Sequence, residues 1–180
     1  IFFIIFYFFF SFPTKSLTVE LNAYYHDVPD NINLIFPGKS LRQWLKTMED
    51  IKKNETFIEE KHKEKFRIMG SYNFDNKEYK FSGQARLTGD WTDHIDLKRG
   101  YSSLSISLTK GNIGGITKFR LLIPITRHTY NEIFWTILIN EMGFFTPHRQ
   151  MIHATLQGSK KILMIFEEKP EKEFLESKGF

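Results

Sequence analysis

Residues 66–87, FRIMGSYNFDNKEYKFSGQARL, contain the clearest structural pattern in the chain. Apolar or small residues alternate with mostly polar ones on both sides of residues 75–78, DNKE, a composition typical of a tight turn. A period of two residues places every second side chain on the same face of a strand. The stretch therefore predicts a β-hairpin with one buried face.

Further strands are expected on both sides of this hairpin. Alternation or short apolar runs, bounded by Gly, Pro or polar turns, predict them at residues 17–25, 103–108, 116–124, 151–156 and 161–167. Because the connections between neighbouring strands are short, most of these strands should pair antiparallel.

Two principal helices are predicted from apolar residues at helical spacing, one beginning at Ser40 and one at Thr129. In each, Gln43 or Glu132 follows three residues after the hydroxyl residue, which predicts a capping box. The second helix has a wide apolar face and ends before Gly143, and a short third helix is expected near the end of the chain. The order of elements predicts an α+β domain with a mainly antiparallel sheet and two principal helices.

Composition excludes several classes of site. The chain of 180 residues suits one domain and has no cysteine, so disulfides, thiolate zinc sites and cysteine nucleophiles are excluded. The net charge of +4 is compatible with an anionic ligand such as a nucleotide. The basic residues form no stripe with interleaved aromatics, so no nucleic-acid partner is expected.

Residues 1–12, IFFIIFYFFFSF, are almost entirely apolar. They are fewer than the roughly 20 residues that a membrane-spanning helix needs, and they resemble the apolar part of a signal peptide or the remnant of a membrane anchor. A buried strand is the alternative. We therefore expect an exported or membrane-anchored protein, with a strand-and-helix segment at residues 13–62 and a larger unit at residues 63–180.

Two short stretches of the sequence resemble motifs that bind ions or phosphate. Residues 89–100, GDWTDHIDLKRG, fail the calcium-loop spacing because Ile95 stands where an EF-hand needs glycine. Two interpretations of this stretch are possible: an irregular metal-binding loop, or a turn whose aspartate side chains cap its own backbone. The turn is preferred. Gly38-Lys39-Ser40 resembles the end of a phosphate-binding loop, but Asn33 replaces the required first glycine.

Four segments together resemble a known family. They are ARLTGDW (85–91), KFRLLIP (118–124), NEIFWTILINEMGFFTP (131–147) and KKILMIFEEKPEKEFLE (160–176). In order and spacing, residues 85–176 resemble the first half of the CotH kinase-like family, atypical kinases of the spore coat protein H type. The charged loop at 89–100 and the serine-rich strand after it depart from the family pattern, which indicates a divergent branch.

The resemblance implies an N-terminal kinase-like lobe in an enzyme that uses ATP and Mg²⁺ on a protein or cell-envelope substrate. The catalytic and metal-binding aspartates would belong to a second lobe after Phe180, so this chain on its own is expected to be inactive. Glu168 and Lys169 match the strand end where a kinase has its hinge, and would line an adenine pocket. A charged strand terminus is the alternative reading.

The other implied nucleotide-binding residues lie on the preceding strands and helix. Arg86 and Gly89 match the Arg-Leu-x-Gly start, although an ion pair explains Arg86 equally well. Lys118 and Arg120 share one face of a strand, and Lys118 paired with Glu132 or Glu141 would reproduce the strand-cation and helix-glutamate pair of kinases. The second functional hypothesis is a non-catalytic binding or structural module of the cell envelope.

Overall fold

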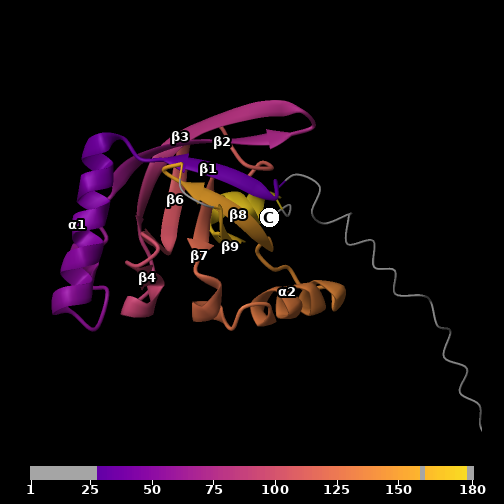
Figure 1. Ribbon diagram of the computed structural model, residues 1–180. Helices are drawn as coiled ribbons and strands as arrows, with labels where there is room; N and C mark the ends of the chain where they lie inside the picture. Colours follow the sequence, from indigo (N-terminus) through magenta and orange to yellow (C-terminus); the bar gives the residue numbers. More distant parts are fainter. Residues whose placement is uncertain (1–27, 159–160, 178–180) are drawn as a thin grey trace, which may run out of the picture.

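The computed structural model describes residues 28–158 and 161–177. Within these residues, seven strands form a closed barrel in the order β1-β2-β3-β6-β7-β9-β8 (Figure 1). The strands are β1 (Asn31–Ile35), β2 (Phe66–Phe74), β3 (Lys77–Leu87), β6 (Leu104–Lys110), β7 (Lys118–Leu122), β8 (Arg149–Leu156) and β9 (Lys161–Glu168). The hairpin expected at residues 66–87 is confirmed as β2 and β3. The strand expected at 17–25 lies outside the described residues.

β1 closes the barrel. It pairs antiparallel with β2, where Leu34 faces Gly70, and parallel with β8, where Leu34 faces Leu156. The predicted α+β fold, an antiparallel sheet resembling a kinase-like N-terminal lobe, is therefore wrong: the sheet is closed and mixed. In β1, NINLI, only Ile32 and Leu34 point inward, and the residues before it are mostly polar. Two alternating positions are too few to predict a strand from the sequence.

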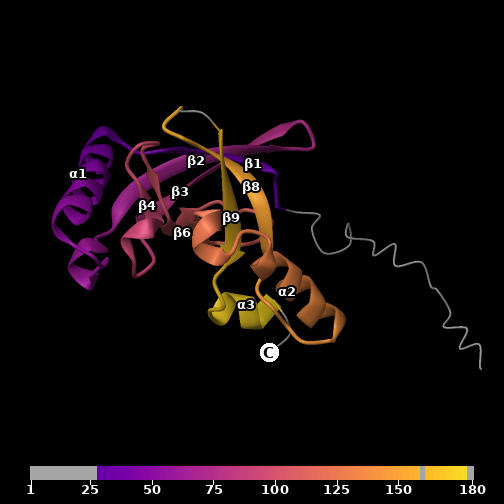
Figure 2. The same ribbon diagram turned by 60° about the horizontal axis from the view of Figure 1, so that its bottom comes forward.

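Helices cover the outside of the barrel. α1 (Gly38–Asn54) packs Trp44, Met48 and Ile51 into the same core as the strands. α2 (Asn131–Glu141) follows a short 3-10 helix, η4 (Pro124–Arg127), and α3 (Lys172–Ser177) follows β9. In Figure 2, where the bottom of Figure 1 is brought forward, α2 and α3 are both seen on this side of the barrel. Two other 3-10 helices are η2 (Glu60–His62) and η3 (Thr92–His94), and β4 (Ile95–Asp96) pairs with β5 (Tyr101–Ser102).

Neither predicted capping box forms at the principal helices. α1 begins two residues earlier than expected, after Pro37, and the Ser40 hydroxyl accepts a hydrogen bond from the Arg67 amide at 3.1 Å instead. α2 begins after Tyr130, because Thr129 has a left-handed backbone with φ of 57°. Glu132 is consequently free to use its carboxylate in side-chain ion pairs.

The core fills the barrel and extends under α1. Inward side chains of successive strands, such as Leu34, Ile106 and Phe119, are fully buried. At one side Trp44 stacks on Phe36 with ring centroids 4.4 Å apart, and its indole N–H donates to the Ser102 hydroxyl at 2.9 Å. The buried tryptophan thus satisfies its polar atom while it fixes α1 on the barrel.

Gly70 is required for the close approach of β1, β2 and β3. A Cβ at this position would lie 2.3 Å from the Phe81 ring and 2.4 Å from the Asn33 carbonyl oxygen. Phe81 faces Gly70 across the β2–β3 pair, so its ring occupies the space that the missing side chain leaves.

We predict that Gly70→Ala lowers the free energy of unfolding by about 1–3 kcal/mol, as expected for overpacking a tight core. Gly38→Ala is the control, because its added methyl group meets only the Arg42 side chain, at 3.9 Å, at the start of a helix. Urea unfolding of both variants checks this. Equal stabilities of the two would contradict the role assigned to Gly70.

Candidate functional site

A row of charged side chains crosses three neighbouring strands on the outer face of the barrel. Arg120 on β7 and Arg149 on β8 both pair with Glu167 on β9, which lies between them in the sheet. The Arg120 Nη1–Glu167 Oε1 distance is 2.7 Å and the Arg149 Nε–Glu167 Oε2 distance is 2.6 Å. Glu167 is only 3% exposed, and the two arginines replace the water contacts that its carboxylate loses on burial. We call Arg120, Glu167 and Arg149 the arginine ladder.

The arginine ladder holds α2. Arg149 donates from Nη1 to the Thr136 hydroxyl at 3.1 Å, and its Nε lies 3.7 Å from the Glu132 carboxylate. Glu132 also lies 3.6 Å from Arg127 of η4. Thr136 is the one buried residue of α2. The helix therefore turns Glu132 and Thr136 toward the barrel, while Asn131 and Glu141 at its two ends are exposed.

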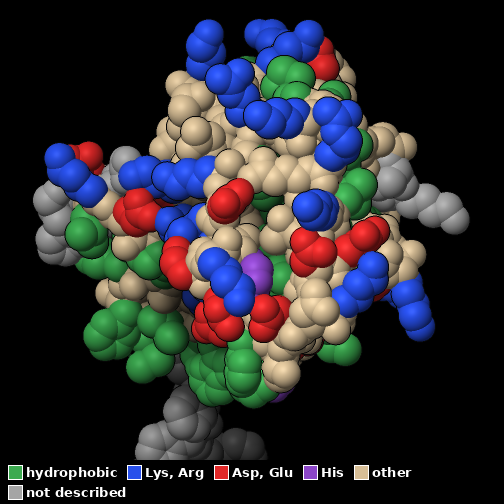
Figure 3. Space-filling model, turned by 90° about the vertical axis from the view of Figure 1, so that its left-hand side faces the viewer, with side chains coloured by type: hydrophobic (Ala, Val, Ile, Leu, Met, Phe, Trp, Pro, Cys, Tyr) green, Lys and Arg blue, Asp and Glu red, His purple; other side chains and the backbone are tan. Residues whose placement is uncertain are grey.

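The apolar side of α2 faces outward. The exposed large apolar residues of η4, α2 and the loop after it are Ile125, Tyr130, Phe134, Trp135, Leu138, Ile139, Met142, Phe144 and Phe145. We call this set the α2 surface. Figure 3, seen from the α1 side, shows hydrophobic side chains gathered along the lower edge of the molecule and basic side chains along the upper edge. In Figure 1 the ends of α1 and β4 share this lower edge with η4 and α2. Monomeric soluble proteins rarely expose contiguous apolar patches beyond a few hundred Å², and larger ones mark interaction sites.

The structure brings two of the residues expected from the sequence into this region. Arg120 belongs to the ladder, and Glu132 reaches it through Arg149. The cations and the carboxylates in this region are paired with one another. The arrangement is suited to fixing a helix, because each charged group that is withdrawn from water gains an opposite charge.

Lys118 and Lys169 lie next to the ladder and share one carboxylate. The Lys118 Nζ–Glu171 Oε2 distance is 2.8 Å, and Lys169 pairs with the other Glu171 oxygen. Hydrogen bonds from Lys118 and then Lys169 lower the pKa of Glu171 to about 2. The expected pairing of Lys118 with Glu132 or Glu141 is replaced by this pair with Glu171. Glu168 accepts a hydrogen bond from the His148 amide at 3.2 Å, at the start of β8.

Arg86 and Gly89 lie elsewhere. Arg86, on the outer face of β3, forms an exposed ion pair with Glu60, with 3.0 Å between Arg86 Nη1 and Glu60 Oε1. This is the ion pair that was the alternative explanation for Arg86. Gly89 has φ of 98°, and a Cβ there would lie 2.1 Å from the His94 ring. That ring is buried and its Nδ1 lies 2.9 Å from the Ser103 hydroxyl oxygen. Burial lowers the pKa of His94, so the ring is held neutral. Gly89 thus makes room for a structural histidine.

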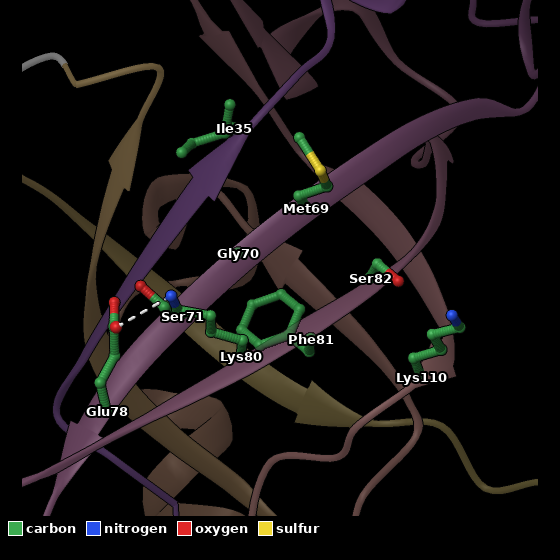
Figure 4. A pocket seen from close by; sticks show the side chains of 9 residues that line it. All are labelled: Ile35, Met69, Gly70, Ser71, Glu78, Lys80, Phe81, Ser82 and Lys110. Carbon is green, nitrogen blue, oxygen red and sulfur yellow. Dashed lines mark ion pairs between the residues drawn. The ribbon is translucent and has the colours of Figure 1, made fainter.

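A shallow hollow of about 470 Å³ lies on the opposite side of the barrel, over β1, β2 and β3 (Figure 4). Its apolar lining includes Ile35 and Met69, both on the outer face. At one margin Lys80 pairs with Glu78 at 3.4 Å, the contact that is dashed in Figure 4. The hollow contains none of the residues expected from the sequence. The α2 surface is the stronger candidate, because it has more exposed aromatic residues and its helix is held by the arginine ladder.

The described residues provide neither a metal site nor a membrane-spanning helix. Across 28–158 and 161–177, no group of three or more histidine, aspartate or glutamate side chains is placed to hold a metal ion. No helix in these ranges combines the length and apolarity required to cross a bilayer. No protein-family model matches the chain, and no curated protein matches it either. The resemblance to the CotH kinase-like family therefore stays a prediction.

The residues that sequence reasoning missed are Arg149, Glu167 and Thr136. Two of them had a weak signal. Glu167 follows the apolar run ILMIF, where a carboxylate is unusual for a half-buried strand, and Thr136 interrupts the apolar sequence IFWTILI. Arg149 had no signal of its own, since its partners come from β9 and α2.

We predict that Arg149→Met lowers the free energy of unfolding by about 1.5–3 kcal/mol, because hydrogen bonds to a buried carboxylate are lost. The control is Arg86→Met, which removes an exposed pair and should cost less than about 1 kcal/mol. Urea unfolding measures both changes. Amide hydrogen exchange in α2 should accelerate in the Arg149 variant alone, and equal exchange in both variants would show that the ladder does not hold the helix.

Proposed function

We propose that this chain is a non-catalytic binding module and that the α2 surface is its contact surface. The observation that carries the proposal is the orientation of α2. Its polar residues Glu132 and Thr136 face the arginine ladder, while Phe134, Trp135 and Met142 face outward. A helix that packs on the surface of a protein core normally turns its large apolar side chains inward.

The energetics favour this use of the surface. Burying one large apolar side chain contributes about 1.5–3 kcal/mol, and the α2 surface offers several that lie side by side along one helix. Because ion pairs and hydrogen bonds already hold α2, little conformational entropy would be lost when a partner binds. The surface is thus both preformed and apolar.

The kinase hypothesis rests on the resemblance in sequence. The side chains proposed to hold phosphates are engaged with carboxylates: Lys118 with Glu171 and Arg120 with Glu167. A nucleotide at this place would have to displace these carboxylates from Lys118 and Arg120. The binding-module proposal leaves both ion pairs intact.

We expect isothermal titration calorimetry to detect no saturable binding of Mg-ATP to the full chain, and no phosphoryl transfer from labelled ATP. Lys118→Met and the control Lys80→Met, on the other side of the barrel, should behave like the unaltered chain. Saturable ATP binding that is lost in Lys118→Met but kept in Lys80→Met would restore the kinase hypothesis.

The proposal itself is tested by photo-crosslinking in cells that express the full chain. Phe134 is replaced by photoreactive benzoylphenylalanine, and Phe57 is replaced in the same way as a control. The two side chains are 60% and 48% exposed, and Phe57 contacts Trp91 outside the α2 surface. Adducts of any kind are expected at position 134 in clear excess over position 57. Equal yields at the two positions would contradict the proposal.

A further inference from the structure

We propose that the partner of the α2 surface is a lipid bilayer, on which α2 lies in the plane of the interface. This inference rests on the proposed function and names its partner. Five aromatic residues, Tyr130, Phe134, Trp135, Phe144 and Phe145, lie within the set together with Ile125 and Met142. Trp and Tyr are enriched at membrane interfaces, where an apolar ring and a polar atom are accommodated together.

The path of the chain supplies an independent reason. The Gln150 side-chain amide donates to the Val28 carbonyl oxygen at 3.2 Å, and the neighbouring Arg149 contacts α2. The first described residue, Val28, therefore lies next to β8, the strand that also contacts α2 through Arg149. Residues 1–12 are almost entirely apolar, so the same chain has a second lipid-compatible segment. A second membrane-binding segment in one chain would raise the effective concentration of the α2 surface at a membrane.

Charge distinguishes this mode of binding from an electrostatic one. Between residues 125 and 145 the ionisable acidic and basic residues are Arg127, His128, Glu132 and Glu141. Arg127 and Glu132 pair with each other, and Glu141 is exposed. The α2 surface thus has no basic cluster for anionic headgroups. Binding should depend on apolar partitioning, should require no anionic lipid and should respond little to salt.

The dimensions of α2 define how it would bind. An α-helix rises about 1.5 Å per residue, so the 11 residues of α2 cover about half of a hydrocarbon core roughly 30 Å thick. The helix is therefore suited to lying flat, with its outward apolar side inserted about 5–10 Å. Its polar side remains against the arginine ladder, so no buried charge has to enter the lipid.

The absence of cysteine allows one environment-sensitive label per molecule. Met142→Cys is labelled with the fluorophore NBD in the full chain, and Met69→Cys is the matched control on the far side of the barrel (Figures 1 and 4). The two methionines are 65% and 48% exposed. With phosphatidylcholine vesicles, the label at position 142 should show a severalfold rise in intensity, a blue shift and quenching by lipid-borne quenchers. The label at position 69 should not change.

A second pair of variants tests the surface itself. In the Met142→Cys background, Phe134→Ser with Trp135→Ser should weaken the vesicle response by about tenfold or more. Phe57→Ser with Trp91→Ser removes another exposed and contacting Phe–Trp pair, and should leave the response unchanged. Circular dichroism of all variants confirms that they are folded.

Each alternative result has a defined meaning. Vesicles that bind the chain without changing the label at position 142 would show attachment through another segment and would overturn the bilayer proposal. Equal responses at both labels would also overturn the bilayer proposal. So would a response at position 142 that rises with protein concentration without lipid, because it would identify a second copy of the chain as the partner.

The crosslinking experiment separates the bilayer proposal from the proposed function. If the bilayer proposal fails but Phe134 forms protein adducts, the chain is still a binding module. If position 134 forms no adducts, both proposals are contradicted.

Discussion

The contact between Arg149 and Glu167 determines how the outside of this barrel is organised. A carboxylate on β9 that is almost fully withdrawn from water requires compensation, and arginines from the strands on both sides provide it. Because a guanidinium group has five donors in a fixed plane, Arg149 serves Glu167 and still reaches Thr136 and Glu132 on α2. Together with the Arg127–Glu132 pair, this side chain holds α2 with Glu132 and Thr136 toward the barrel and its aromatic residues outward.

The barrel provides the rigid frame for that arrangement. Since β1 pairs with both β2 and β8, the sheet has no open edge, and β7, β8 and β9 are held side by side with Arg120, Glu167 and Arg149 in register. An open sheet of the kind found in a kinase lobe would leave β1 and β8 as edges. The closed form also separates two sides of the molecule, one with the α2 surface and one with the shallow hollow over β1–β3.

The proposed function follows from the unusual orientation of α2, whose large apolar side chains face away from the barrel. A helix rich in Phe, Trp, Ile and Leu would ordinarily cover the core with its apolar side, and here it covers a row of charges. Exceptions of this kind are expected at functional sites, where a protein departs from the pattern that would stabilise it most. A lipid interface removes the conflict, because it buries the apolar side while the ion pairs stay intact.

Local sequence patterns determined most of the elements that the structure describes, but not β1. The period-two alternation of residues 66–87 fixed a hairpin with one buried face, and helical spacing placed both principal helices to within a few residues. These patterns depend on neighbours in the chain. Tertiary structure decided the rest: the closure by β1, the role of Gly89 beside His94, and the pairing of Arg120 with Glu167, which are 47 positions apart. Alternation shows which side chains share a face of a strand, but it does not show which strands become neighbours, and the charge pairs depend on that.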